Sequence, residues 1–220
     1  MGENITITAA DGHQFNAWRA GEGPGLVVIQ EIFGVNSHIR NTVDRFAEHG
    51  FQAVAPALFD RIKPGLELGY ETDDVARGRE LRGQIANADA VADVAATIQW
   101  LAGQGRPVGC VGYCWGGSLA WAAATGIDGL SASVGYYGGE IAANASATPN
   151  CPVILHFGEN DHGIPMEQVD TVKAAHPDLP VFTYPAGHGF SCDERASFDQ
   201  ASHELALGRT LDFLREHLGS

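Results

Sequence analysis

The chain has little positive charge and no long hydrophobic run. Its 13 lysines and arginines stand against 27 aspartates and glutamates, so the formal net charge is -14 at pH 7. A chain of this charge repels a phosphate backbone, and we expect no nucleic-acid partner. No stretch approaches the roughly eighteen consecutive apolar residues of a membrane span, and the N-terminal residues lack a basic segment followed by an apolar core. We therefore expect a cytoplasmic protein that does not associate with a membrane.

Cysteine is also scarce. The four cysteines are Cys110, Cys114, Cys151 and Cys192, and none of them lies in CxxC spacing. A chain of this length does not need disulfide bonds to compensate for a small core, so we expect reduced thiols. The spacing predicts no zinc site, no other metal site and no cofactor.

Apolar residues are plentiful enough for a substantial core. They make up 45% of the chain, against 18% charged residues. No repeat or linker-like segment divides the sequence, and we expect a single domain over residues 1–220. Strand signals alternate with helical ones, which is typical of an α/β domain with a mainly parallel sheet and helices on both faces. Strands are predicted near residues 5–7, 15–18, 26–29, 51–55, 108–113, 131–136, 152–157 and 181–184.

The helical segments are less regular. Asn36 or Ser37 can cap a helix that Gly50 is well placed to end. The stretch 71–104 has a helical composition but contains Gly78 and Gly83, so we expect two helices or one interrupted helix. Further helices are predicted over residues 116–125, 165–175 and around 205–218.

Residues 112–116, Gly-Tyr-Cys-Trp-Gly, fit the nucleophile-elbow pattern G-x-Nuc-x-G of the α/β-hydrolase fold, with cysteine in the position that serine more often occupies. They follow the apolar run 108–111 and precede a predicted helix, which is the strand-turn-helix context that the motif requires. Gly112 and Gly116 are needed because the turn brings neighbouring backbone very close. A buried, inert cysteine is the simpler explanation of a lone GxCxG, but this context favours a nucleophile at Cys114.

The position of Cys114 at the start of a helix has two chemical consequences. The helix dipole and the free amides there favour the thiolate, which is the reactive form of cysteine. The backbone amide of Trp115 is the expected first donor of an oxyanion hole.

An acid and a histidine follow the elbow in the order that this fold requires. Asp161 lies in a loop after the strand 152–157, where its carboxylate could orient an imidazole; Glu159 is the local competitor. His188 lies between two glycines in a loop after the next strand, a position that core packing explains poorly. Most of the nine histidines are expected to be surface residues. His156 is expected to be packed on its strand, and His162 is a competitor for the role of base.

Three segments together resemble the dienelactone hydrolase family: residues 30–34 (Gln-Glu-Ile-Phe-Gly), 112–117 (Gly-Tyr-Cys-Trp-Gly-Gly) and 186–190 (Ala-Gly-His-Gly-Phe). The similarity runs almost end to end and includes residues 135–138 and 158–161. The resemblance implies an α/β-hydrolase fold and the hydrolysis of a dienelactone to maleylacetate, as in the degradation of aromatic compounds.

The resemblance also implies roles for individual residues. Cys114, His188 and Asp161 would form a catalytic triad. The amides of Ile32 and Trp115 would form the oxyanion hole. Glu31 would lie close to the resting thiol and take its proton when substrate arrives, although an exposed loop glutamate is the simpler alternative.

The substrate is less closely specified. Family members bind the substrate carboxylate with two arginines, one of them four positions after the catalytic histidine, and here that position is Cys192. Arg195 is the nearest downstream alternative. For the other arginine, residues 77–82 offer Arg77, Arg79 and Arg82. Substrate-binding roles are predicted for Arg77, Arg79 and Tyr137, with solvated helix arginines as the alternative.

Three hypotheses of function follow. In the first, Cys114 attacks an activated ester or enol-lactone, a thioester forms, and water activated by His188 hydrolyses it. The second is a general carboxylesterase acting on small neutral esters, which the cysteine at position 192 favours. The third is a non-catalytic protein that binds ligands or senses redox state through a reactive Cys114. The expected partner is a small-molecule ester or lactone, and the expected assembly is a monomer or a small homo-oligomer.

Overall fold

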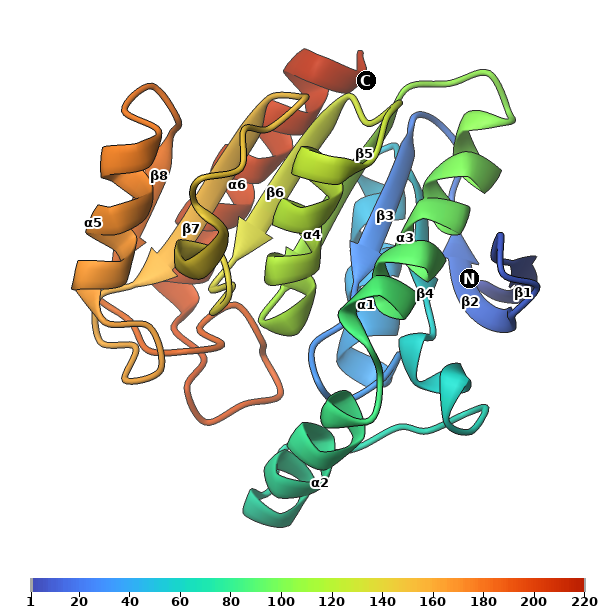
Figure 1. Cartoon of the computed structure of the whole chain (residues 1–220), viewed down its shortest axis with the longest axis horizontal. Helices are drawn as coiled ribbons and strands as arrows, with labels where there is room; N and C mark the ends of the chain where they lie inside the picture. Colours follow the sequence, from blue (N-terminus) through green and yellow to red (C-terminus); the bar gives the residue numbers. More distant parts are fainter. Residues whose placement is uncertain (1, 220) are drawn as a thin grey trace.

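The computed structural model describes residues 2–219 and contains an eight-stranded sheet in the order β1-β2-β4-β3-β5-β6-β7-β8 (Figure 1). β1 and β2 form an antiparallel hairpin that pairs antiparallel with β4, and every other pairing is parallel. The strands are β1 (Glu3–Thr8), β2 (Gln14–Ala20), β3 (Gly25–Ile29), β4 (Gln52–Pro56), β5 (Val108–Tyr113), β6 (Ala132–Tyr136), β7 (Val153–Gly158) and β8 (Val181–Tyr184).

Helices cover both faces of this sheet, as the alternating pattern predicted. In the view of Figure 1, three helices lie in front of the sheet: α3 (Asn87–Ala102), α4 (Trp115–Gly126) and α5 (Met166–Ala175). Behind it lie α1 (Ser37–Glu48) and α6 (Gln200–Leu218), and α2 (Thr72–Gly83) lies beyond the carboxyl ends of the strands. Because the central strands are covered on both sides, every residue of β3, β4 and β5 is buried.

The predicted capping of α1 is confirmed. Asn36 is its N-cap and accepts a hydrogen bond from the amide of Ile39, while Val43 and Phe46 are buried on the same face. Gly50 follows the helix with φ of +92°, a conformation that favours glycine.

The stretch 71–104 forms two helices, but the break is not at Gly78. That glycine lies inside α2 and is buried, and a Cβ atom on it would overlap the carbonyl oxygen of Ile32. The chain leaves the helix only after Gly83. Gly78 is therefore a packing glycine that lets α2 approach the loop after β3.

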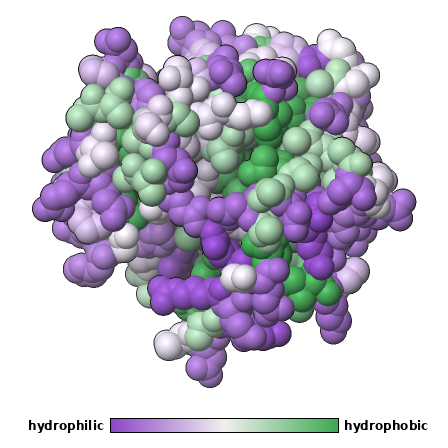
Figure 2. Space-filling model, in the orientation of Figure 1, coloured by the Kyte–Doolittle hydropathy of each residue, from purple (hydrophilic) through white to green (hydrophobic). Residues whose placement is uncertain are grey.

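Hydrophilic residues cover most of the face seen in Figure 2, and hydrophobic residues appear in a band through its middle. Of the large hydrophobic side chains in residues 2–219, Leu205 alone is classed as exposed. No helix in this part of the chain is both long and apolar enough to cross a membrane. The single domain over residues 1–220 stays a prediction, and its two terminal positions lie outside the described residues.

Candidate active site

Cys114 occupies a strained turn between β5 and α4. Its φ of 55° and ψ of -114° are rare for a residue with a side chain, and its carbonyl accepts from Ser118 in the first turn of α4. A Cβ on Gly112 would overlap the carbonyl of Gly116, and a Cβ on Gly116 would overlap the carbonyl of Ile29. The two glycines are therefore required by close backbone packing, as the elbow pattern predicted. The thiol itself is partly exposed.

His188 and Asp161 are directly bonded. The imidazole Nδ1 lies 2.7 Å from Oδ2 of Asp161, and the other carboxylate oxygen accepts from the amide of Gly163 at 2.8 Å. The competing carboxylate of Glu159 accepts instead from the hydroxyl of Thr183. His162, the competing base, is exposed. His188 is thus paired with Asp161 and not with Glu159.

The charges at this pair favour a protonated imidazole. Burial lowers the pKa of His188, but the hydrogen bond to Asp161 and the neighbouring sulfur of Cys114 outweigh burial and raise it to about 10. The pKa of Asp161 is below its usual value, because the bonds from His188 and from the loop amides outweigh the effect of burial. The arrangement can hold an imidazolium between a carboxylate and a sulfur.

Tyr137 packs beside His188. The two rings have centroids 5.1 Å apart, and Tyr137 also contacts Phe190 at 5.4 Å. Its φ of 38° marks a second strained residue at the carboxyl ends of the strands. The side chain is fully buried, and its hydroxyl has no hydrogen-bond partner within residues 2–219. Tyr137 therefore supports the imidazole, and its contact with substrate stays a prediction.

The two predicted oxyanion donors lie at the ends of neighbouring strands. Trp115 is the first residue of α4, where amides have no acceptor within the helix. Ile32 lies three residues after β3, which pairs with β5. The side chain of Gln30 braces this loop by donating to the carbonyl of Glu31 and accepting from the amide of Leu58, each at 3.1 Å. A carbonyl oxygen held near both amides would be stabilised as negative charge develops on it.

Glu31 is buried and paired with Arg195. Nη1 of Arg195 donates to Oε1 of Glu31 at 3.0 Å, and the guanidinium lies over the rings of Phe33 and Tyr70 at 5.6 and 5.9 Å. A Cβ on Gly189 would be 2.5 Å from the same guanidinium. Burial lowers the pKa of Arg195, but the nearby charges, Glu31 first and Cys114 among the others, raise it overall. One arginine is thus anchored between the loop after β3 and the loop that carries His188.

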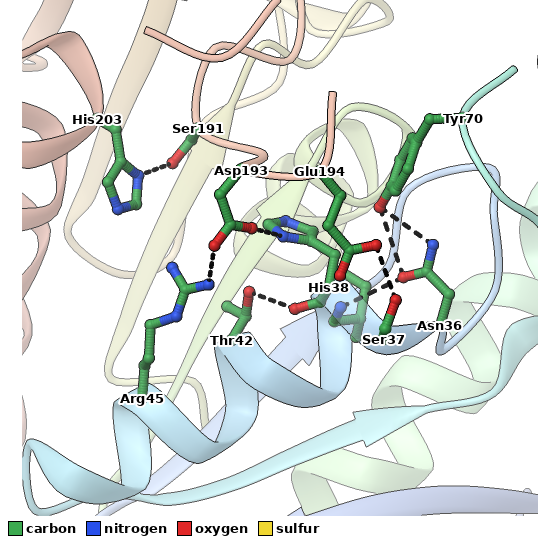
Figure 3. A network of polar contacts seen from close by, with 11 residues as sticks. Asn36, Ser37, His38, Thr42, Arg45, Tyr70, Ser191, Asp193, Glu194 and His203 are labelled. Carbon is green, nitrogen blue, oxygen red and sulfur yellow. Dashed lines mark hydrogen bonds and ion pairs between the residues drawn. The ribbon is translucent and has the colours of Figure 1, made fainter. Parts of the chain in front are cut away.

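The segment after His188 is held against α1 by polar contacts (Figure 3). The carboxylate of Asp193 bonds to His38 Nδ1 at 2.9 Å and to Arg45, and Glu194 accepts from the hydroxyl of Ser37 at 2.7 Å. These contacts fix the segment that places both Arg195 and the buried Cys192.

The arginines of α2 are not brought into this group. Arg77 is half exposed and paired with Glu80 on the same helix, and Arg79 is exposed. Arg82 is paired with Glu140, and its guanidinium lies 5.9 Å from the ring centre of Trp115. The predicted substrate-binding roles of Arg77 and Arg79 therefore have no support from their positions.

Sequence reasoning assigned no role to His38 or Tyr70 and left the direction of Arg195 open. All three surround Glu31, which also lies close to Cys192. No local motif marks them, because their proximity depends on contacts between distant segments; His38 and Asp193, for example, are 155 residues apart.

Comparison with protein families gives one match that covers nearly the whole chain. The sequence model of the dienelactone hydrolase family matches residues 12–218. The carboxymethylenebutenolidase of Pseudomonas putida is 34% identical over 227 residues, which cover 96% of this chain and 95% of that protein.

Solved structures agree with this match. A provisionally named dienelactone hydrolase from Klebsiella pneumoniae subsp. pneumoniae MGH 78578 superimposes with a TM-score of 0.84 at 28% identity, covering 98% of each chain. A dienelactone hydrolase-like promiscuous phosphotriesterase from metagenomic libraries gives a TM-score of 0.79 at 21% identity, covering 99% of each chain. The second similarity concerns the fold alone, and both confirm the predicted α/β-hydrolase fold.

Proposed function

Since the chain belongs to the dienelactone hydrolase family and is a hydrolase of carboxylic esters or lactones, we propose that it cleaves an enol-lactone or another activated ester through Cys114. The observation that carries the proposal is the His188–Asp161 bond of 2.7 Å, and it is supported by the effect of the Cys114 sulfur, which helps to raise the pKa of His188. A nucleophile, a base and an orienting acid on separate loops are the three parts of acyl transfer by a triad.

The first half of the reaction forms a thioester. The Cys114 thiolate attacks the carbonyl carbon, and the amides of Ile32 and Trp115 stabilise the resulting oxyanion. The intermediate then collapses, its carbon–oxygen ester bond breaks, and the leaving enolate takes the proton of the His188 imidazolium. A thiolate is itself a good leaving group, so the forward reaction requires a leaving oxygen that departs at least as easily. An enolate meets this condition better than a simple alkoxide.

The second half releases the acid. His188, now neutral, takes a proton from water as the oxygen attacks the thioester carbonyl. Collapse of the second intermediate breaks the carbon–sulfur bond and restores the thiolate beside the imidazolium. The carboxylate of Asp161 keeps Nδ1 of His188 protonated throughout, so that Nε2 faces the reacting groups.

Arg195 supports an anionic substrate. Its guanidinium is held by a single bond to Glu31 and by ring contacts, so a substrate carboxylate can compete with Glu31 for it. Displacement would free Glu31 to take the proton from any Cys114 that is present as the thiol, which leaves the attacking thiolate. On this proposal Arg195 takes the part that the resemblance assigns to an arginine at position 192.

Turnover measurements test the proposal. We expect the wild type to hydrolyse cis- or trans-dienelactone with a higher kcat/KM than p-nitrophenyl acetate, and Cys114→Ser to lose at least about 100-fold in kcat on both. Cys151→Ser is the matched control. Cys151 lies just before β7, at the amino ends of the parallel strands and so opposite to the candidate site, and its replacement should leave turnover unchanged. Full activity of Cys114→Ala would contradict the mechanism.

Hydrolysis of neutral esters is the second candidate function. Cys192 is buried, so the position expected to carry a substrate-facing arginine offers no cation. A protein that cleaves the aryl ester well and the lactone poorly would support this alternative. Rapid labelling of Cys114 without any catalysed hydrolysis would instead indicate a thiol-reactive binding protein.

A further inference from the structure

Three side chains from distant parts of the chain meet behind the candidate active site. One carboxylate oxygen of Glu31, one ring nitrogen of His38 and the sulfur of Cys192 all lie within 4.8 Å of one another. Each of these residues is at most 1% exposed. In the part of the chain that the structure describes, they form the one group of at least three potential metal ligands this close together.

Two atoms of this group are buried without a partner. Nε2 of His38 and Oε2 of Glu31 accept or donate no hydrogen bond within residues 2–219. A buried polar atom without a partner costs roughly 1–3 kcal/mol, more when it is charged, so two in one cluster require an explanation. A ligand that both atoms can bind would supply it.

The surroundings of His38 suit a metal ligand. Its Nδ1 is bonded to Asp193 at 2.9 Å, and Asp193 is itself held by Arg45 (Figure 3). Histidines that bind metals usually donate their other ring nitrogen to a carboxylate, which fixes the ring and directs Nε2 to the ion. The bond to Asp193 therefore leaves Nε2 as the ligating atom.

We propose that Glu31, His38 and Cys192 form a Zn²⁺ site. One oxygen, one nitrogen and one sulfur are the donor set that zinc accepts, at bonds of about 2.0–2.3 Å, whereas a thiolate disfavours Mg²⁺ and Ca²⁺. Three protein ligands leave one position for water. On binding, the thiol of Cys192 and any protonated Nε2 release their protons. A carboxylate and a thiolate then balance the two charges of the ion, while Arg195 stays on Oε1 of Glu31.

No metal-ligand spacing in the sequence predicts this site. Its members follow β3, begin α1 and lie in the loop before α6, so the CxxC and HxxxH patterns of many zinc sites do not arise. The prediction that the chain has no metal site depended on those patterns.

A cobalt titration tests the site directly. Co²⁺ bound to a thiolate gives a charge-transfer absorption, and we use the metal alone with the Cys114→Ser variant, so that the candidate nucleophile cannot contribute. We expect the absorption band in the Cys114→Ser variant and also in the control that carries both Cys114→Ser and Cys151→Ser. We expect the band to disappear when Cys192→Ser is added to the Cys114→Ser variant. When His38→Gln or Asp193→Asn is added instead, we expect the Zn²⁺ affinity, measured by calorimetry, to fall at least tenfold.

The outcomes separate cleanly. Absence of cobalt and zinc binding in the Cys114→Ser variant, or a cobalt band that survives when Cys192→Ser is added to it, overturns the proposal. If Cys192→Ser does not fold, the His38→Gln and Asp193→Asn affinities decide. Inhibition of ester hydrolysis by Zn²⁺ through capture of Glu31 is a consequence that rests on the proposed function. Zinc binding without inhibition therefore supports the site and contradicts the role given to Glu31.

Discussion

Nη1 of Arg195 donates a hydrogen bond to Oε1 of Glu31 over 3.0 Å, and the carboxylate that it holds is only 1% exposed. The pair joins the loop after β3 to the segment after His188. A buried carboxylate that loses this cation is destabilised unless it takes up a proton. The guanidinium is therefore part of the fold near Cys114, and on the proposed function it is also the cation that meets a substrate anion.

Replacing this arginine should affect anionic substrates selectively. A hydrogen bond to a charged group contributes about 1.5–3 kcal/mol, so we expect Arg195→Ala to raise KM for dienelactone roughly 10- to 100-fold. KM for the neutral p-nitrophenyl acetate should change much less. Initial-rate kinetics on both substrates provide the comparison.

Arg77→Ala is the matched control, because Arg77 is half exposed and pairs only with Glu80. We expect both KM values to stay within about twofold, as for most surface substitutions. A larger effect on dienelactone from Arg77→Ala than from Arg195→Ala would restore the original assignment of the carboxylate to α2.

The acid of the proposed triad can be identified by a pair of amide substitutions. Asp161→Asn keeps the size of the side chain but weakens its hold on the His188 proton, and we expect kcat to fall by about 10²- to 10⁴-fold. Glu159→Gln should leave kcat unchanged, since Glu159 bonds to Thr183 instead. Equal losses in the two variants would mean that the loop as a whole, rather than Asp161, sets the rate.

The parts of the site that local sequence predicts are those that local structure forms. The elbow at Cys114 is a strand, a turn and a helix in sequence. Gly112 is required by a contact with Gly116 four residues later, whereas Gly116 is required by the backbone of Ile29 on the neighbouring strand. The pairing of His188 with Asp161 could be predicted because the order of nucleophile, acid and histidine follows from the order of the strands. The fold class was predictable because strand and helix signals alternate along the chain.

The direction of side chains between distant segments was not predictable. Arg195 reaches Glu31 only because Asp193 and Glu194 dock on α1, more than 140 residues away in sequence. Arg77 and Arg79 flank Gly78, the residue by which α2 packs on Ile32. Residues adjacent in a helix point about 100° apart, so the buried glycine turns both arginines toward solvent. Composition cannot reveal which side of α2 is the buried one.

The elbow glycine Gly112 in β5 should tolerate substitution far less than Gly126 at the end of α4. In Gly112→Ala the new methyl would overlap the carbonyl of Gly116, and backbone must move to relieve it. We expect a loss of more than about 2 kcal/mol in the free energy of unfolding, measured by urea denaturation. Gly126→Ala, with open space around its Cβ position at the end of α4, should change stability by less than about 1 kcal/mol. Similar stability of the two variants would show that the turn can relax.

The protonated state of His188 should be visible as a dependence of stability on pH. Burial lowers the pKa of its imidazole, but Asp161 and Cys114 raise it overall from 6.5 to about 10. Because the folded value lies above the unfolded one, the resulting stabilisation is complete below pH 6.5 and is lost as the pH rises toward about 10. We expect the free energy of unfolding to decline across this window in the wild type and to decline less in His188→Gln. His162→Gln, in an exposed position of the neighbouring loop, should keep the wild-type slope. Urea unfolding at several pH values measures all three slopes, and equal slopes in the wild type and His188→Gln would mean that folding does not raise the pKa of His188.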